Sequence, residues 1–347
     1  MNQTLNGIRR ILITILVAMG IGALFIVAIG ENPIDAYAAL FRGAFDGELR
    51  LGTTLAGFTP LLLTSIAFAV AAKAGAFNVG VEGEVFLGGI TAAYIGINWT
   101  FLPKPALYVA CFVGAMVVAA AWAFIPAVLR AYYNVNEVCT TILMNTVALY
   151  ITSYLVSGPM SAGTANAQSL PVTVRLYQFM KPSSVNVGIF IAAITVIVII
   201  FMLQKSWGYK IRTVGLNPTH ADYVGIDSKK VFVGAMMLSG MLGGMAGCIE
   251  VLGVHGYFLN NFATGLGSNG MLAALIVKNN MVSTPFMAFF LAVLKSGAMG
   301  MQQSTGVPKS LVDTITAVFI IIATMETAFQ FTKKRKKKTE EKKEDKA

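Results

Sequence analysis

The chain has 347 residues, of which 56% are hydrophobic and only 12% are charged. A soluble domain carries about 25% charged residues, so this composition excludes an ordinary soluble protein and indicates a membrane protein. The formal charge of +10 does not indicate nucleic-acid binding, because the last sixteen residues, 332–347, hold nine basic and four acidic residues and supply half of it. We expect this basic tail to be disordered and solvated in the cytoplasm, where it can also contact anionic lipid head groups.

Ten apolar runs predict an all-α, polytopic integral membrane protein with about ten transmembrane helices in one transmembrane domain, 1–331. The runs cover residues 11–29, 51–72, 85–99, 105–129, 137–157, 186–203, 231–252, 266–277, 284–303 and 310–331. The first run exceeds the apolar core of a signal peptide, about 7–15 residues, and we expect it to be retained. Gly-rich stretches at 80–89 and 264–270 indicate broken or re-entrant segments, so the number of spans can differ from ten by two.

Basic residues fall mainly on one side of these predicted spans. With the N-terminus inside, ten basic residues before the tail lie on the cytoplasmic side and six lie outside. Lys and Arg are enriched in cytoplasmic connections of membrane proteins. We therefore expect a multi-pass protein of the cell membrane with both termini in the cytoplasm.

The sequence indicates no metal site, disulfide framework or catalytic residue. Cys111, Cys139 and Cys248 lie inside apolar runs without metal-ligand spacing and are expected to be small buried hydrophobes. The two histidines are too isolated to indicate a metal site. The stretch GLGSNG at 265–270 fits the pattern G-x-G-x-x-G, but no strand precedes it, so we expect the entry to a short helix rather than a dinucleotide-binding loop.

The stretch FNVGVEGEVFLGG at 77–89 places two carboxylates and four glycines between apolar runs. Glu82 and Glu84 lie about 200° apart on a helix and share no face unless the chain breaks there, as Gly80 and Gly83 would permit. Irregular backbone inside a membrane is tolerated where it is buried in protein or lines an aqueous cavity. We expect Asn78 and Glu82 to contact the substrate along a polar path through the membrane. The alternative is that this stretch forms only a cytoplasmic turn after Lys73.

Two further polar features lie inside apolar runs. In the run 137–157, Thr140 and Asn145 belong to a polar helical face, which either joins helices by hydrogen bonds or lines a pore. Glu250 is a lone carboxylate that needs a partner or water, and we expect it near the outer mouth. Four glycines at 240–247 are better explained by close helix packing. The predicted substrate-path residues are thus Asn78, Glu82, Thr140, Asn145 and Glu250.

The predicted cytoplasmic connection, 204–230, contains the stretch RTVGLNPTHADYVGID. Asn217 is a good N-cap, Pro218 fits the first helical position, and Gly225 is placed to end the helix in a left-handed conformation. The seven residues 218–224 rise only about 10 Å, and so short a helix is not stable alone in water. It must therefore be held either by this protein's own surface or by another subunit.

The segment from Arg212 to Ile226 resembles the coupling region of bacterial ABC-importer permeases of the branched-chain amino acid, simple sugar and nucleoside group. Four other stretches are similar to the nucleoside branch, whose permeases work with nucleoside-binding lipoproteins: FNVGVEGEVFLGG, NEVCTTILMN, GGMAGCIEVLGV and GLGSNGMLAALI. The older consensus of the coupling region, Glu-Ala-Ala followed three residues later by Gly, is matched only at Ala221 and Gly225. The match is therefore closer to this particular group than to that consensus.

The resemblance implies a permease subunit that translocates nucleosides by alternating access in the inner or cytoplasmic membrane of a bacterium, and that is not itself an enzyme. The chain contains no G-x-x-x-x-G-K-[ST] loop, so ATP would bind to a separate ABC ATPase subunit, and no cofactor is expected on this chain. A second permease, expected to be a paralogue, and an extracellular substrate-binding lipoprotein complete the implied partners. The residues implied to couple to the ATPase are Asn217, Pro218, His220, Ala221 and Gly225.

Two other functions stay open at this point. The first is a permease for simple sugars of the same group, which would differ from a nucleoside permease mainly in the amino-acid sequence of the stretch at 77–89. An ion-coupled secondary transporter would use Glu82 and Glu250 as coupling sites and would need no ATPase.

Overall fold

The computed structural model describes residues 19–317 except 309, 312 and 316. Within this part of the chain the regular structure is helical, and the β-type pairings are three isolated bridges. The helix Met19–Ile29 comes first. It is followed by α2 (Pro33–Phe45), α3 (Gly47–Lys73), α4 (Val81–Asn98), α5 (Lys104–Tyr133), α6 (Glu137–Ser157), α7 (Gly188–Gln204), α8 (Ser206–Leu216), α9 (Pro218–Tyr223), α10 (Ser228–Ile249), the π-helical turn η1 (Glu250–His255), α11 (Leu266–Ile276) and α12 (Thr284–Thr305).

The all-α prediction is confirmed for the described residues, but their helices give fewer spans than ten. Five helices are long and apolar enough to cross a membrane: α3, α5, α6, α10 with η1, and α12. Two bent pairs raise the number to seven if each pair is one span: Met19–Ile29 with α2, bent by 113°, and α7 with α8, bent by 73°. The last predicted run, 310–331, lies mostly outside the described residues, as does the start of the first.

The described residues form two compact units, Asp46–Val293 and a smaller one that combines the described residues before Asp46 with those after Val293. In the smaller unit, Ile26, Leu40 and Met301 are buried in one cluster. A Cβ at Gly43 would lie 2.7 Å from Cα of Gly300, so a side chain at this position would force the two helices apart.

The larger unit is built around α10, which packs against α3, α4 and α5. Small residues make this packing close: a Cβ at Gly240 would lie 2.6 Å from the carbonyl oxygen of Ala119 on α5. A Cβ at Gly243 would lie 2.9 Å from Cβ of Glu84 on α4. The predicted packing role of the glycines at 240–247 is confirmed, because backbones can approach closely only where side chains are absent.

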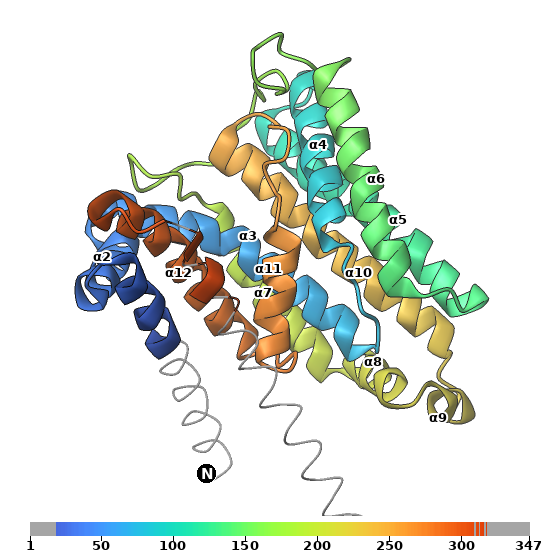
Figure 1. Ribbon diagram of the computed structural model, residues 1–347. Helices are drawn as coiled ribbons and strands as arrows, with labels where there is room; N and C mark the ends of the chain where they lie inside the picture. The colour runs from blue at the N-terminus through green and yellow to red at the C-terminus, as the bar shows by residue number, and fades with distance from the viewer. Residues whose placement is uncertain (1–18, 309, 312, 316, 318–347) are drawn as a thin grey trace, which may run out of the picture. The chain divides into compact units, whose positions relative to one another are not determined.

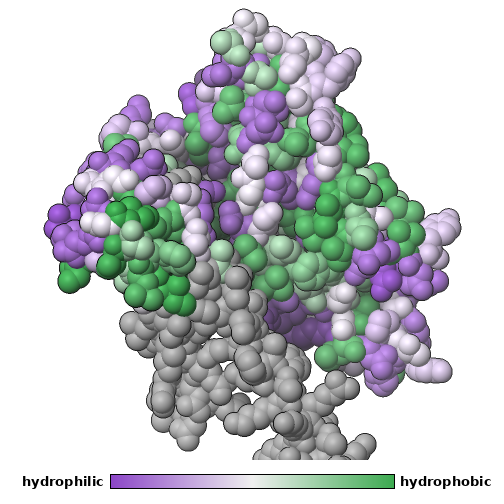
Figure 2. All heavy atoms as spheres, viewed as in Figure 1, coloured by the Kyte–Doolittle hydropathy of each residue, from purple (hydrophilic) through white to green (hydrophobic). Residues whose placement is uncertain are grey.

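The larger unit has two distinct ends (Figure 1). The short helices α8 and α9 lie at one, called the α9 end below, and the long connection 158–187 lies at the other. Between them, α5 and α6 leave much of their apolar surface uncovered, since only 33% and 17% of their apolar windows are buried. Figure 2 shows hydrophobic side chains gathered over the side of the unit where these two helices run. This is the surface that lipid or another membrane subunit would cover.

Candidate translocation and coupling sites

The segment between α3 and α4 enters the larger unit as irregular backbone. Helix α3 ends at Lys73, and Gly75 turns the chain with a φ of +80° beside Gly215 of α8. The following residues, 76–80, run from the α9 end toward the start of α4 (Figure 1). A turn thus follows Lys73, and an irregular, largely buried segment lies beyond it, while its contact with a substrate path stays a prediction.

Asn78 holds this segment in place with every hydrogen-bonding atom of its amide. Its Nδ2 donates to Oε1 of Glu84 and to Oγ of Ser239, each at 2.9 Å, and its Oδ1 accepts from the amide of Gly80 at 2.9 Å. Asn78 and Glu84 are each only 1% exposed. One buried side chain thus joins the irregular segment, α4 and α10.

Of the two glycines that would permit a break, Gly80 marks it and Gly83 does not. Helix α4 begins at Val81 with Gly80 as its N-cap and continues through Gly83, so the break precedes both carboxylates. Glu82 and Glu84 consequently point to different neighbours, as two residues about 200° apart on a helix must. Glu84 faces Asn78, whereas the Oε2 of Glu82 accepts a 3.4 Å hydrogen bond from Ser268 of α11.

Asn145 of α6 caps the start of α4. Its Oδ1 accepts from the amide of Gly83 and its Nδ2 donates to the carbonyl of Val79, both at 2.8 Å. The first amides of a helix have no partner within the helix, and the N-cap residue Gly80 has no side chain to supply one. A neighbouring helix therefore provides the cap, two turns or about 12 Å beyond its own start at Glu137.

The other two predicted path residues are placed differently. The hydroxyl of Thr140 donates back to carbonyls of its own helix, and it is the next residue, the buried Thr141, that lies against Gly80. Glu250 opens the π-helical turn, and its Oε2 lies 3.6 Å from Nε2 of His255.

The structure thus brings Asn145 together with the segment from Asn78 to Glu82, whereas Thr140 bonds to its own helix and Glu250 lies near His255. Sequence reasoning missed Ser239 and Ser268. Both are small hydroxyl residues inside apolar or Gly-rich runs, and their spacing carries no signal.

The predicted short helix is confirmed as α9, which ends at Tyr223, one residue earlier than expected. Oδ1 of Asn217 accepts from the amide of His220 at 3.0 Å, and Pro218 occupies the first helical position. At the other end, Gly225 has a φ of +81°. The amide of Ile226 donates to Ala221 at 2.9 Å and that of Gly225 to Asp222 at 3.1 Å, which is the Schellman arrangement.

Helix α9 is held by its own chain and still exposes apolar side chains. Ala221 is fully buried, and the carboxylate of Asp222 accepts from the amide and the hydroxyl of Ser228, each at 2.9 Å, at the start of α10. The neighbouring helix α8 was not predicted. Leu216 at its end and Tyr223 of α9 are 87% and 86% exposed. The first alternative, a helix held by this protein's own surface, is therefore confirmed, and docking to another subunit stays a prediction.

The residue before α10 strengthens this junction. Asp227 is the N-cap of α10 and accepts from the amide of Lys230 at 3.0 Å. This hydrogen bond from the Lys230 backbone holds the pKa of Asp227 below its usual value. The start of α10 is thus fixed by two aspartates, one from α9 and one from its own cap.

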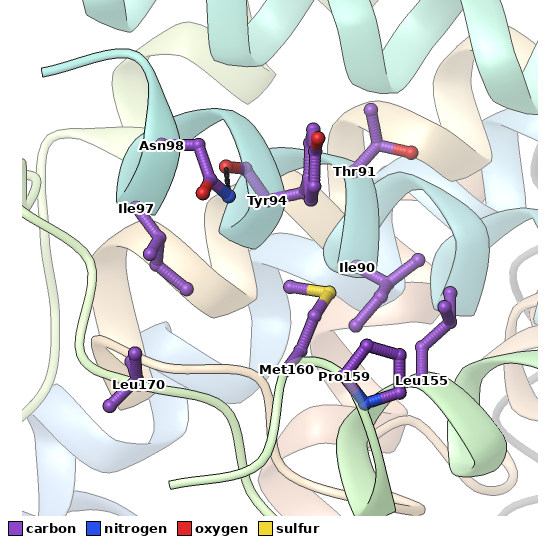
Figure 3. Close-up of a pocket in the computed structure, with 9 residues that line it drawn as sticks. All are labelled: Ile90, Thr91, Tyr94, Ile97, Asn98, Leu155, Pro159, Met160 and Leu170. Atoms are coloured by element: carbon purple, nitrogen blue, oxygen red, sulfur yellow. Dashed lines mark hydrogen bonds between the residues drawn. The ribbon is translucent and has the colours of Figure 1, made fainter.

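A pocket of about 430 Å³ lies at the end of the larger unit opposite α9 (Figure 3). Its wall comprises Ile90 and Tyr94 of α4, Leu155 of α6, and Leu170 of the connection 158–187, with their neighbours. No pattern in the sequence predicted it, because α4 is distant along the chain from α6 and the connection that follows α6.

Comparison with known proteins covers nearly the whole chain. It is 33% identical to the guanosine ABC transporter permease protein NupP of Bacillus subtilis, over 94% of this chain and 96% of that protein. It is 30% identical to the nucleoside ABC transporter permease protein NupB of Lactococcus lactis, over 92% and 91% of the two chains. It is 32% identical to the glucose ABC transporter permease protein TsgB13 of Haloferax volcanii, over 89% and 85%.

Residues 50–324 match the family model described as branched-chain amino acid transport system, permease component. This match spans all of the larger unit except its first residues. It therefore includes α9 and the residues whose hydrogen bonds hold the start of α4, Asn78 and Asn145. A permease component is a transport subunit rather than an enzyme. The chain belongs to this family of ABC-transporter permeases.

Proposed function

We propose that this chain is the membrane-spanning permease of an ATP-driven importer that carries nucleosides by alternating access. Relatives named for guanosine and nucleoside transport are similar to it over almost their whole length, which supports this substrate class. The glucose relative is nearly as similar, so a simple sugar is the second candidate. In the bilayer of a bacterial cell, the partners would be an ABC ATPase, a second permease of the same family and an extracellular binding lipoprotein.

The observation that carries the proposal is α9, a six-residue helix with a complete cap at each end. So short a helix has little stability of its own, yet its caps and the Asp222–Ser228 bonds fix it on the surface. Exposed Leu216 and Tyr223 then present apolar area to a partner. Lys and Arg are frequent around it, which favours the cytoplasmic side, where an ATPase works.

A continuous set of contacts leads from α9 to the proposed path. Asp222 ties α9 to Ser228 at the start of α10, and Ser239, three turns further, ties α10 to Asn78. Asn78 and Asn145 together fix the start of α4, which carries Glu82. Displacement of α10 by a closing ATPase would therefore move this start relative to α6. We assign Asn78, Glu82 and Asn145 to the path, with Thr140 on α6 and Glu250 in η1 as further members of it.

The test is ATP-dependent uptake by the chain assembled with its ATPase, second permease and binding protein in proteoliposomes. Tyr223→Ala removes the exposed ring of α9 and should lower guanosine uptake and ATPase stimulation at least fivefold. Tyr177→Ala is the matched control, because Tyr177 is 71% exposed but lies in the connection 158–187 at the other end. Equal effects of the two variants would contradict the docking role, and uptake of glucose but not guanosine would favour the second candidate.

A further inference from the structure

The pocket in Figure 3 has two chemically different walls. Helix α4 contributes the polar residues Thr91, Tyr94 and Asn98, spaced at i, i+3 and i+7 along one side of the helix, and also Ile90 and Ile97, so that its wall is mixed. The facing wall is apolar and is formed by Leu155, Pro159, Met160 and Leu170. Small-molecule sites are commonly cavities of about 300–1,000 Å³ with mainly apolar linings and a few polar groups, and this pocket fits that description.

The polar wall retains hydrogen-bonding capacity. The hydroxyl of Thr91 donates to the carbonyl of Leu87 at 2.7 Å and keeps its lone pairs as acceptors. Nδ2 of Asn98 donates to the carbonyl of Tyr94 at 2.9 Å, which leaves Oδ1 and one N–H hydrogen. Among the residues that the structure describes, none forms a hydrogen bond with the hydroxyl of Tyr94, whose side chain is 51% exposed. A ligand can therefore find both donors and acceptors on this wall.

The lining selects against several classes of ligand. None of its residues is charged, so a zwitterionic amino acid or a phosphorylated compound would lose solvation of its charges without gaining an ionic partner. A lipid acyl chain would leave the polar groups of α4 against hydrocarbon. A sugar carries hydroxyls on most of its surface, and the apolar wall could not satisfy them.

A neutral molecule with one flat, weakly polar face and one hydrogen-bonding edge fits both walls. A nucleoside has this form, because its base can stack on an aromatic ring while its edge and its ribose make hydrogen bonds. Tyr94 supplies the ring, and Thr91 and Asn98 supply polar groups one turn to either side of it.

The position of the pocket is consistent with this ligand. Ile90 and Tyr94 follow Gly83 by two and three turns on the side of α4 that faces α6. The pocket therefore lies between α4 and α6, as the hydrogen bond between Gly83 and Asn145 does. It lies at the end opposite α9, where substrate would arrive if α9 faces the cytoplasm.

We propose that this pocket is a nucleoside-binding site within a single permease subunit, with the base stacked on Tyr94 and polar contacts from Thr91 and Asn98. The proposal rests on the proposed function and adds to it a location and a means of selecting neutral nucleosides. The ligand would occupy it before the contact of Asn145 with the start of α4 opens.

Equilibrium binding of radiolabelled guanosine to the purified complex of permeases and ATPase, without the binding protein, tests the site. Tyr94→Ala should raise the dissociation constant at least tenfold, whereas Tyr94→Phe keeps the ring and should change it less than threefold. Tyr154→Ala is the control, because Tyr154 is 72% exposed on α6 and does not line the pocket. Leu155→Trp, which fills the cavity from the apolar wall, should abolish binding.

Wild-type uptake, measured in parallel, separates the two proposals. If the wild-type complex transports guanosine but shows no saturable binding, or if Tyr94→Ala and Tyr154→Ala bind alike, the pocket proposal is overturned and the transport function stands. If the wild type neither binds nor transports guanosine, both proposals fail. If Leu155→Trp removes co-purified phospholipid and leaves guanosine binding unchanged, the pocket holds an acyl chain instead.

Discussion

Gly80 has no side chain with which to cap α4, and the amide of Asn145 takes that place from α6. This arrangement makes the start of α4 depend on the position of another helix. A cap within one helix would move with it, whereas this one is lost when α4 and α6 separate. Asn145 is therefore suited to a contact that forms in one state of a transport cycle and breaks in the other.

Asn145→Ala should lower the stability of the purified permease. It leaves the amide of Gly83 and the carbonyl of Val79 without their partner, and each unsatisfied buried group costs about 1–3 kcal/mol. The midpoint of thermal unfolding in detergent measures the effect. Asn98→Ala is the control, because its amide donates only to a carbonyl of its own helix. Unfolding of both variants at the same temperature would contradict the capping role.

We expect Glu84 to act through its shape and its acceptor oxygen rather than through charge. It is buried, its Oε1 accepts from Asn78, and its Oε2 has no hydrogen-bond partner in the described structure. Glu84→Gln keeps the acceptor and should preserve stability and uptake. Glu84→Leu removes the carboxylate that accepts from Nδ2 of Asn78, which lowers the free energy of unfolding by about 1–3 kcal/mol. This variant should therefore reduce stability and uptake. Equal losses in Gln and Leu variants would show that the charge itself is needed.

Helix α9 could be predicted from the sequence, whereas the long-range hydrogen bonds of Asn145 and Asn78 at the start of α4 could not. The signals for α9 are local, since Asn217, Pro218 and Gly225 lie within nine residues and each acts on its neighbours. Asn145 and Gly83 are 62 residues apart, and Asn78 and Ser239 are 161 apart. Such pairs are set by helix packing, which no periodicity in one segment reveals. The same reason explains why Ser239 was missed although Asn78 was chosen.

Gly225→Ala tests α9 as an element. The φ of +81° is unfavourable for any residue with a Cβ, by about 1–2 kcal/mol, so the Schellman turn should loosen and α9 should shift. We expect the number of ATP molecules hydrolysed per guanosine imported to rise at least threefold.

Gly163→Ala provides the matched control, because Gly163 has a φ of +69° and open space around it, as Gly225 does, but lies in the connection 158–187. The same rise in both variants would mean that the effect is general strain. An unchanged ratio in Gly225→Ala, with normal assembly, would remove α9 from the coupling mechanism.

At the scale of the whole molecule, apolar runs revealed which segments avoid water but not which of them cross the membrane. Helix α11 rises only about 17 Å over its 11 residues, too short for a hydrocarbon core of about 30 Å. Helix α4 has two carboxylates in its first turn and starts inside the larger unit. The apolar runs predict both as spans, whereas among the described residues five helices meet the length and composition of a span, or up to seven spans if each bent pair is one.

A separate ATPase is proposed to drive this permease through α9. The most direct measurement is guanosine uptake into proteoliposomes that contain the chain with and without its ATPase partner, supplied with ATP or with an imposed proton gradient. We expect uptake only when the ATPase and hydrolysable ATP are both present, and no loss of uptake when a protonophore collapses the gradient. Uptake by the permease alone that follows the proton gradient would contradict it and would identify an ion-coupled transporter.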